Sequence, residues 1–445
     1  MAMEQLEKSY LKNSGGQNGR REIIKNGLKS RTVAALVGFS LVGTILAATG
    51  VANIRPLDFP VHTWTTWAIN DFLKVQKPDV VLMGSSLMLV PLDGVDADFL
   101  GKKIDGSAHH RSEFLEERYS RYSGQKARTF NFALPGEMPS DAYLISRFLL
   151  KGERTPRVLV YGVGPRDFMD NLLPSPAATD PFQYLSRLGN WDSRVNLIMP
   201  QWQERLNYEL GKLCYTYGVR GQIALDVSRL ADKVLNKIAP RPNTGLSNVE
   251  LIALRRKLLP DYKATEVNAN ECMFRPIANE QRPAFQDNIQ EYRKRYKTLK
   301  RETFDSQMTF LKDILATSKE RGTHVLLVAM PITDVNRNLL SDSSWALYKE
   351  SLRKLAQDGG ASFYDMHAPG DFKLADFQDT VHLHSGGGAK LLDKIAAILV
   401  SDKDCQAALS KSQAELSKSH AALSRSQAAL SQSQALPAKN QAVPQ

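Results

Sequence analysis

Cysteine is scarce in this chain. Only three of its 445 residues are cysteines, Cys214, Cys272 and Cys405. They are widely spaced and form no CxxC or Cys/His pattern, so the sequence indicates neither a structural zinc site nor a disulfide framework. An oxidising compartment would allow Cys214 and Cys272 to pair, a point that spacing alone does not decide. We expect neither a metal nor a cofactor.

A concentrated charge of one sign is also missing. The formal charge is +11, from 58 basic and 47 acidic residues, but seven bases and three acids lie in residues 1–31, and the tail from residue 401 adds only +2. The remaining +5 is spread over the whole middle of the chain, whereas proteins that bind nucleic acids gather basic residues on one surface. The sequence therefore predicts no nucleic-acid partner.

Long apolar runs are absent, with one exception. The 23 residues between Arg31 and Arg55 carry no charge, and as a helix they would extend roughly 34 Å, enough for the hydrocarbon core of a bilayer. The basic residues ahead of this run predict a cytoplasmic segment over residues 1–31 and export of the chain that follows. We therefore expect a single-pass anchor over residues 32–54 in a lipid bilayer, with the bacterial inner membrane and the periplasm as its setting. A cleaved signal peptide is the alternative, because small residues close the run.

Beyond the anchor, residues 55–77 are predicted to be a juxtamembrane connector, whose Trp64 and Trp67 suit the headgroup boundary or the surface of the domain. Short apolar runs then alternate with helical patterns. Each run is rich in β-branched or aromatic residues, which is typical of strands buried on both faces, and the alternation with helices predicts a parallel α/β sheet. The five predicted strands are residues 79–83, 127–132, 157–162, 324–330 and 361–365.

The main domain is predicted to cover residues 78–400, interrupted by a mostly helical insert over residues 168–300. Residues 290–317 are interpreted as one long helix that returns the chain to the sheet. From residue 401 to residue 445 the sequence has low complexity, with leucine at every seventh position. The other core position of this heptad is polar, so a weakly helical or disordered tether is favoured over a coiled coil.

Two short motifs carry the candidate chemistry. Ser86 follows a predicted strand in the sequence Gly-Ser-Ser, at the edge where open parallel sheets bind ligands. Near the other end of the domain, Asp379 precedes His382 by three residues. On one turn of backbone the carboxylate can accept the imidazole N–H and stabilise the imidazolium when the other ring nitrogen takes a proton from a serine. A capping serine and a structural aspartate are the alternative when each motif is taken alone.

With these motifs the sequence resembles the SGNH/GDSL hydrolase superfamily over residues 78–167 and 323–400. Gly84-Ser85-Ser86 stands where the family has Gly-Asp-Ser, and Asp379 and His382 match its Asp-x-x-His block. The resemblance implies a flavodoxin-like three-layer α/β fold and a triad of Ser86, His382 and Asp379. Ser85 makes the chain similar to the exported, membrane-anchored acyl-transfer branch, which includes the D-alanyl transfer protein and alginate O-acetyltransferase-like proteins.

The resemblance also implies an oxyanion hole formed by the N–H groups of Ser86 and Gly136. The third family block departs from the pattern, because this chain has Gly-Val-Gly-Pro-Arg-Asp over residues 162–167 where the family has Gly-x-Asn-Asp. Arg166 or a backbone N–H near Gly164 would have to replace the missing asparagine. Losing such a donor typically costs about 10²–10³ in rate.

Three further histidines were weighed as site residues. His384 faces away from His382 if that stretch is extended, which makes it a lesser candidate. His109 and His110 lie in a polar loop without acidic or cysteine partners at ligand spacing, so a solvated pair is favoured over a metal site.

Two functions are therefore in competition. The first is a serine esterase or O-acyltransferase that acts on O-acyl groups of an envelope or extracellular polysaccharide, with an acylated polysaccharide or another ester as substrate and a membrane-bound protein as a possible acyl donor. The second is a catalytically inactive scaffold or binding module in an envelope or polysaccharide-secretion complex. The intact Ser86, His382 and Asp379 set favours the first, and the missing asparagine and the low-complexity tail favour the second.

Overall fold

The computed structural model describes residues 30–48, 63–213 except 76, 102, 103 and 105, residues 215–218, 220, 227, 231, 234 and 235, and residues 283–410 except 369. Contacts divide the chain into two compact units. One unit comprises Met1–Asp58 and Met199–Gly245, and the other comprises Phe59–Ile198 and Leu246–Gln445. The predicted domain boundaries remain a prediction.

The larger unit is built on a five-stranded sheet with the order β2-β1-β3-β4-β5, and all of its strand pairs are parallel. All five predicted strands are present, and their ends lie within two residues of the predicted ones. The central strands β1 and β3 are buried along their whole length, as expected for apolar runs covered on both faces. The strands are β1 (Val80–Gly84), β2 (Thr129–Asn131), β3 (Val158–Val163), β4 (His324–Ala329) and β5 (Ser362–Asp365).

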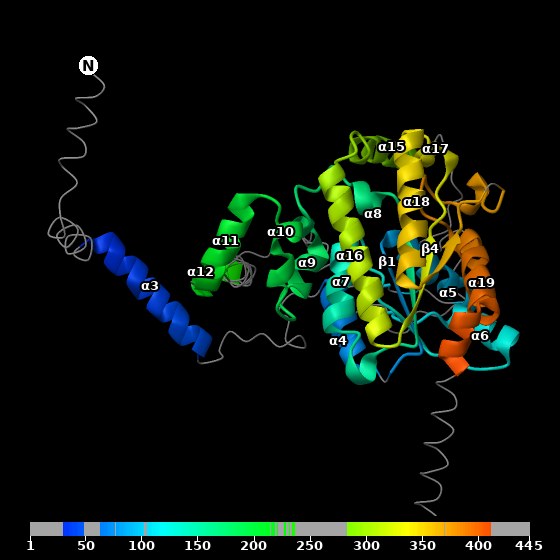
Figure 1. The fold of residues 1–445 in the computed structure, drawn as a ribbon, viewed down its shortest axis with the longest axis horizontal. Coiled ribbons are helices and arrows are strands. Elements are labelled where there is room, and N and C mark those ends of the chain that lie inside the picture. Colours follow the sequence, from blue (N-terminus) through cyan, green and yellow to red (C-terminus); the bar gives the residue numbers. More distant parts are fainter. Residues whose placement is uncertain are drawn as a thin grey trace, which may run out of the picture. The chain divides into compact units, whose positions relative to one another are not determined.

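Helices cover the two faces of this sheet (Figure 1). On one face, α19 (Ser385–Ser401) packs on α5 (Ser86–Leu100) and α6 (Glu113–Ser123). On the other face, α16 (Arg301–Glu320) packs on α7 (Pro139–Phe148) and α18 (Asp342–Gly359). The observed architecture is therefore a parallel α/β sheet between two helical layers. Shorter helices of this unit are α8 (Arg166–Met169), α9 (Asp180–Leu185), α10 (Val195–Ile198) and α17 (Asp334–Arg337).

The long helix expected over residues 290–317 was wrong in one respect. The chain forms two helices there, α15 (Pro283–Arg295) and α16, which begins at Arg301. The Asn171 side chain donates hydrogen bonds to the carbonyl oxygens of Arg295 and Thr298 at the break. Its amide group therefore satisfies carbonyls that a continuous helix would have paired internally, which a local periodicity does not reveal.

The segment predicted as a connector contains helix α4 (Trp64–Lys74), which begins with a capping box formed by Thr63 and Thr66. Trp67, Ile69 and Phe72 are buried in the larger unit. Of the two interpretations of the tryptophan pair, the structure therefore favours packing on the domain for Trp67.

The other unit contains α3 (Arg31–Ala48), α11 (Trp202–Leu213) and α12 (Tyr215–Gly218). Residues 49–54 of the predicted anchor lie outside the described residues. Within the described part of the chain, no helix combines the length and the apolar character that crossing a membrane requires.

The predicted tail begins with residues that belong to the folded unit. Residues 403–410 are helical, and both Cys405 and Leu409 are buried. A tether that starts at residue 401 was therefore wrong for these first residues, because their apolar side chains pack against the domain. The rest of the predicted tail, residues 411–445, lies outside the described residues. So do Cys214, Cys272 and most of residues 219–282, which belong to the predicted insert.

Candidate active site

Ser86 is the first residue of α5, directly after the buried strand β1. The turn that carries it depends on Gly84, whose φ is +145°. A Cβ at this position would lie 2.4 Å from the carbonyl oxygen of Gly162 in β3, so only glycine allows the two strands to approach this closely. The hydroxyl of Ser86 is thereby placed at the carboxyl edge of the sheet, beside the unpaired N–H groups of the first helical turn.

Asp379 and His382 are held on one turn, as the sequence motif predicted. Asp379 Oδ1 accepts the backbone N–H groups of Val381 and His382, both at 2.8 Å. Asp379 Oδ2 lies 2.7 Å from His382 Nδ1. The same carboxylate therefore fixes both the backbone of the turn and the orientation of the imidazole.

Ser86 and His382 meet across the edge of the sheet, with Ser86 Oγ 2.8 Å from His382 Nε2. Burial acts to raise the pKa of Asp379, but hydrogen bonds from the His382 ring and from two backbone N–H groups outweigh it, so this pKa lies below its ordinary value. An ionised Asp379 accepts a hydrogen bond from the Nδ1–H of His382, which leaves Nε2 as the acceptor for the Ser86 hydroxyl. The arrangement meets the geometric requirement for a base that activates a serine.

The predicted oxyanion residues Gly136 and Arg166 are also neighbours. Gly136 has a φ of +75°, and its carbonyl oxygen accepts a hydrogen bond of 2.9 Å from Arg166 Nη1. Arg166 Nε donates to Asp170 Oδ2 at 2.9 Å. The guanidinium is thus locked against the Gly136 loop, which keeps it near the edge where Ser86 emerges. Its role as an oxyanion donor remains a prediction.

The backbone alternative near Gly164 is occupied. The Gly164 N–H donates to Asp167 Oδ2 at 2.8 Å, and the Ser85 hydroxyl lies 3.5 Å from the same oxygen. Asp167 therefore ties the loop after β3 to the residue that precedes the candidate nucleophile. Of the predicted substitutes for the missing asparagine, the Gly164 N–H is therefore already paired, and Arg166 remains a prediction.

A group of buried acids beneath this edge was not found from the sequence. It consists of Glu137, Asp141 and Asp167, all with less than 3% of their surface exposed. Burial raises the pKa of Asp141 to about 7 and that of Asp167 to about 6. Burial, reinforced by Asp141 and Asp167, also raises the pKa of Glu137 well above its ordinary value. The one local signal was Asp141, the third residue of a helix that begins with proline and the partner in its capping box.

The three other candidate histidines, His384, His109 and His110, have structural partners. His384 precedes α19, and its Nδ1 accepts the Gly386 N–H at 2.8 Å, which turns the ring away from Ser86. The solvated pair expected at positions 109 and 110 was wrong. His109 Nε2 lies 2.7 Å from the buried Asp96 Oδ2, and His110 stacks on Phe130 with ring centroids 5.4 Å apart. Their partners are far away in sequence, so spacing along the loop did not reveal them.

One group of metal-ligand side chains occurs among the described residues, formed by His324, Asp402 and Cys405. It lies at the amino-terminal end of β4, at the opposite edge of the sheet from Ser86. His324 Nε2 is 2.9 Å from Ser362 Oγ, which in turn donates to Asp402 Oδ2 at 2.7 Å. Burial raises the pKa of the Cys405 thiol, so the thiolate that binds metals is disfavoured. Mutual hydrogen bonding accounts for this group.

Comparisons with known proteins add little to this geometry. No family model matches the chain, and no curated protein matches it. Two solved structures with some likeness are mutants of Axe2, described as an acetyl-xylooligosaccharide esterase and as an acetylxylan esterase from Geobacillus stearothermophilus. Each is 10% identical in sequence, with a TM-score of 0.30, over 73% of this chain and 94% of that one. A likeness this weak identifies neither the family nor the reaction of this chain.

Proposed function

We propose that this chain is a serine acyl-ester hydrolase or acyltransferase of the SGNH type. The observation that carries the proposal is the unbroken hydrogen-bonded series from Asp379 through His382 to Ser86, with distances of 2.7 and 2.8 Å. The three residues come from two distant parts of the sequence, and each occupies the position that a nucleophile, a base and an orienting carboxylate require.

The reaction begins when His382 Nε2 takes the proton of the Ser86 hydroxyl while Ser86 Oγ attacks the ester carbonyl carbon. Negative charge develops on the carbonyl oxygen, where we expect N–H groups of the first turn of α5, the Gly136 loop and Arg166 to stabilise it. The C–O bond then breaks, and His382 returns its proton to the departing alcohol. Water or a second hydroxyl group attacks the acyl-enzyme by the same steps, which makes the outcome hydrolysis or transfer.

The proposal extends to the setting. We propose that the domain faces the periplasm behind a single-pass anchor at residues 32–54, and that its esters are O-acyl groups on an envelope or extracellular polysaccharide, with a membrane-bound protein as acyl donor in the transferase case. The support for this part is the charge pattern and the family resemblance of the sequence.

The test is labelling of the purified full-length chain with a fluorophosphonate probe, together with hydrolysis of an aryl acetate. We expect labelling and turnover in the unaltered chain and loss of both in Ser86→Ala. Ser385→Ala is the matched control, because Ser385 is the first residue of α19 as Ser86 is of α5. The ring nitrogens of the adjacent His384 already contact the Gly386 N–H and the Ala375 carbonyl oxygen. A folded chain that neither labels nor turns over ester would sink the proposal and favour the inactive scaffold.

A further inference from the structure

A cavity of about 850 Å³ opens at the carboxyl ends of β4 and β5. Its walls come from the segment after β4, from the start of α18 and from the loop after β5. This edge of a parallel sheet is where ligands bind, and the volume lies within the range of small-molecule sites. Nothing in the proposed reaction uses the residues that line it.

The cavity shares a wall with the turn that carries the candidate base. Thr333 lines the cavity and donates from both its backbone N–H, at 3.2 Å, and its hydroxyl, at 2.7 Å, to the carbonyl oxygen of Thr380. Phe377 lines it too and pairs with Leu383 in an isolated bridge. Thr380 and Leu383 lie on either side of His382, so the cavity lies directly behind the Asp379–His382 turn.

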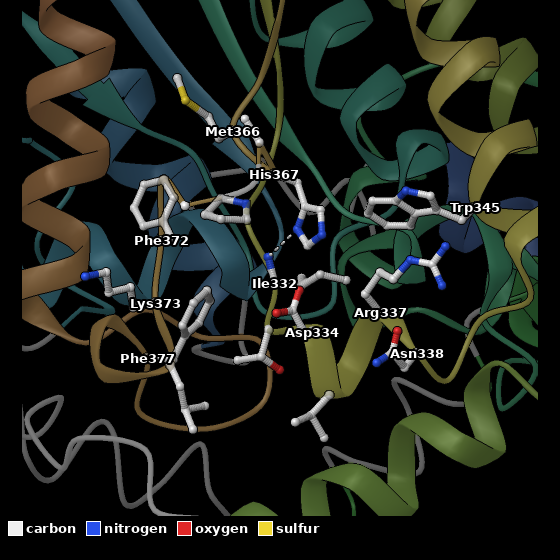
Figure 2. Close-up of a pocket in the computed structure, with 16 residues that line it drawn as sticks. Ile332, Asp334, Arg337, Asn338, Trp345, Met366, His367, Phe372, Lys373 and Phe377 are labelled. Atoms are coloured by element: carbon white, nitrogen blue, oxygen red, sulfur yellow. Dashed lines mark hydrogen bonds between the residues drawn. The ribbon is translucent and has the colours of Figure 1, made fainter.

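Figure 2 shows how the side chains are arranged around the cavity. Trp345 and Arg337 lie on one side, Phe372 and Phe377 lie opposite, and Asp334 lies between them. The indole of Trp345 is held edge-on to His367, with ring centroids 4.7 Å apart. Trp345 and Phe372 are half-buried and Phe377 is buried, and Arg337 and Lys349 lie over the indole at 5.5 and 5.2 Å from its ring centroid. The half-buried rings of Trp345 and Phe372 are therefore the aromatic surfaces of the lining, with polar side chains between them.

Three polar side chains that line the cavity are exposed or half-buried. Asn338 and Lys373 are exposed. His367 Nδ1 lies 3.5 Å from the backbone N–H of Ile332, which donates to it (Figure 2). Burial and the nearby Lys349 lower the pKa of His367, so the ring is neutral at neutral pH and its Nε2–H is a donor. Both donors and acceptors are thus present beside the aromatic rings.

This mixture selects among ligand classes. An acyl chain needs a continuous apolar lining, which the charged and amide groups interrupt. A small anion needs converging positive charge, but Arg337 is already paired with Asp342, and Asp334 lies in the wall. A sugar ring presents C–H groups on its faces and hydroxyl groups on its rim, which match aromatic surfaces and planar polar side chains respectively.

We propose that this cavity binds a saccharide segment, as a carbohydrate subsite behind the catalytic turn. The inference rests on the proposed function, to which it adds the place where the saccharide chain binds. A glycan held there contacts the wall that supports Thr380, so its binding is linked to the position of His382.

The test measures the binding of two oligosaccharides to the full-length chain by saturation-transfer NMR and by calorimetry. Cellohexaose is the neutral probe and a mannuronate hexasaccharide is the anionic probe, and binding of either supports a saccharide site and identifies its charge class. We expect Asn338→Ala and Lys373→Ala to weaken the bound probe about threefold and about tenfold respectively, since a hydrogen bond to a charged group contributes more than a neutral one. Lys354→Ala, an exposed lysine elsewhere on α18, is the matched control and should leave binding unchanged.

The two proposals fail in different ways. Ser86→Ala should bind the oligosaccharides as the unaltered chain does, because Ser86 does not line the cavity. If a probe binds in a manner that depends on Asn338 and Lys373 while no ester is turned over, the carbohydrate subsite stands and the reaction fails. If the serine reacts with fluorophosphonate but neither probe binds, or binding persists unchanged in both cavity variants, the carbohydrate subsite is overturned.

Discussion

Ser86 Oγ lies 2.8 Å from His382 Nε2, although 296 positions separate the two residues in the sequence. Two features of the backbone create this contact. Gly84 allows β1 to run against β3 and release Ser86 at the edge of the sheet, and the Asp379–His382 turn brings the imidazole over the same edge. The contact therefore depends on the fold of the whole unit and is lost if either support is removed.

The role of Asp379 is tested by Asp379→Asn. An asparagine can still accept a backbone N–H but presents no negative charge to the imidazole, which then adopts the wrong tautomer for accepting the Ser86 proton. We expect kcat for an aryl ester to fall about 10³–10⁴-fold with little change in thermal stability. Asp376→Asn is the matched control, since Asp376 lies on the same loop but pairs with Lys390. Equal losses in both variants would mean that the loop, and not the charge, matters.

The sequence was sufficient to predict the five strands, their parallel arrangement and the spatial meeting of Ser86 with Asp379 and His382. Strands buried on both faces carry a continuous apolar signal, and short motifs at strand ends identify the functional edge. The buried acids were not predicted because their hydrogen-bond partners lie far away in the sequence. Asp167 accepts the hydroxyl of Ser85, 82 positions away, and Asp141 accepts the hydroxyl of Thr179, 38 positions away. Such pairings follow from tertiary packing and leave no local periodicity to detect.

The break before α16 and the partners of His109 were missed on the same grounds. Asn171 caps the carbonyls of residues more than a hundred positions away, and Asp96 binds both His109 and the start of α6. Each side chain is an ordinary polar residue in its own neighbourhood. Sequence patterns therefore reveal what repeats along an element, whereas single polar contacts between elements require the structure.

Arg166 is tested as the substitute for the family asparagine. If its guanidinium stabilises the developing oxyanion, Arg166→Met should lower kcat about 10²–10³-fold and change KM little. Arg295→Met is the matched control, because Arg295 shares the partner Asp170 but makes no hydrogen bond to Gly136. If kcat falls no further in Arg166→Met than in Arg295→Met, the role of Arg166 is purely structural.

Gly84, in the turn after β1, is expected to tolerate substitution poorly. Gly84→Ala combines a φ of +145° with a Cβ placed 2.4 Å from the Gly162 carbonyl oxygen. We expect a loss of about 3 kcal/mol or more in the free energy of unfolding, measured by urea denaturation. Gly124→Ala also has a positive φ, +69°, but meets nothing within 4 Å, and should cost only about 1–2 kcal/mol. Similar losses for the two variants would contradict the close approach of β1 and β3.

The surroundings of Ser85 explain why this chain has serine where the family has the aspartate of Gly-Asp-Ser. Its hydroxyl is buried 3.5 Å from Asp167 Oδ2, so Ser85→Asp would place a second carboxyl group against the first. Two carboxylates in one buried site cannot both ionise without repulsion. We expect Ser85→Asp to lower the melting temperature, and Asp167→Asn to restore most of the loss in the double variant. A double-mutant cycle with no coupling between the two positions would contradict this explanation.

Asp141 is expected to give the fold a measurable pH dependence. Burial raises its pKa from 3.8 to about 7 in the folded chain, so between these pH values the folded protein holds a proton that the unfolded chain has released. Unfolding in this window releases a proton, and the contribution of Asp141 to the free energy of unfolding is therefore largest at low pH and falls as the pH rises toward about 7. The slope from one such group is at most about 1.4 kcal/mol per pH unit.

Asp141→Asn tests this expectation, because an asparagine can accept the Met138 N–H and bond the Thr179 hydroxyl without titrating. Urea denaturation is measured between pH 5 and pH 7, inside this window. The free energy of unfolding of Asp141→Asn should fall less steeply with pH than that of the unaltered chain. Asp358→Asn, at an exposed position of α18, is the matched control and should leave the slope unchanged. An equal slope in Asp141→Asn and the unaltered chain would mean that Asp141 is ionised in the folded protein, and that its two hydrogen bonds outweigh its burial.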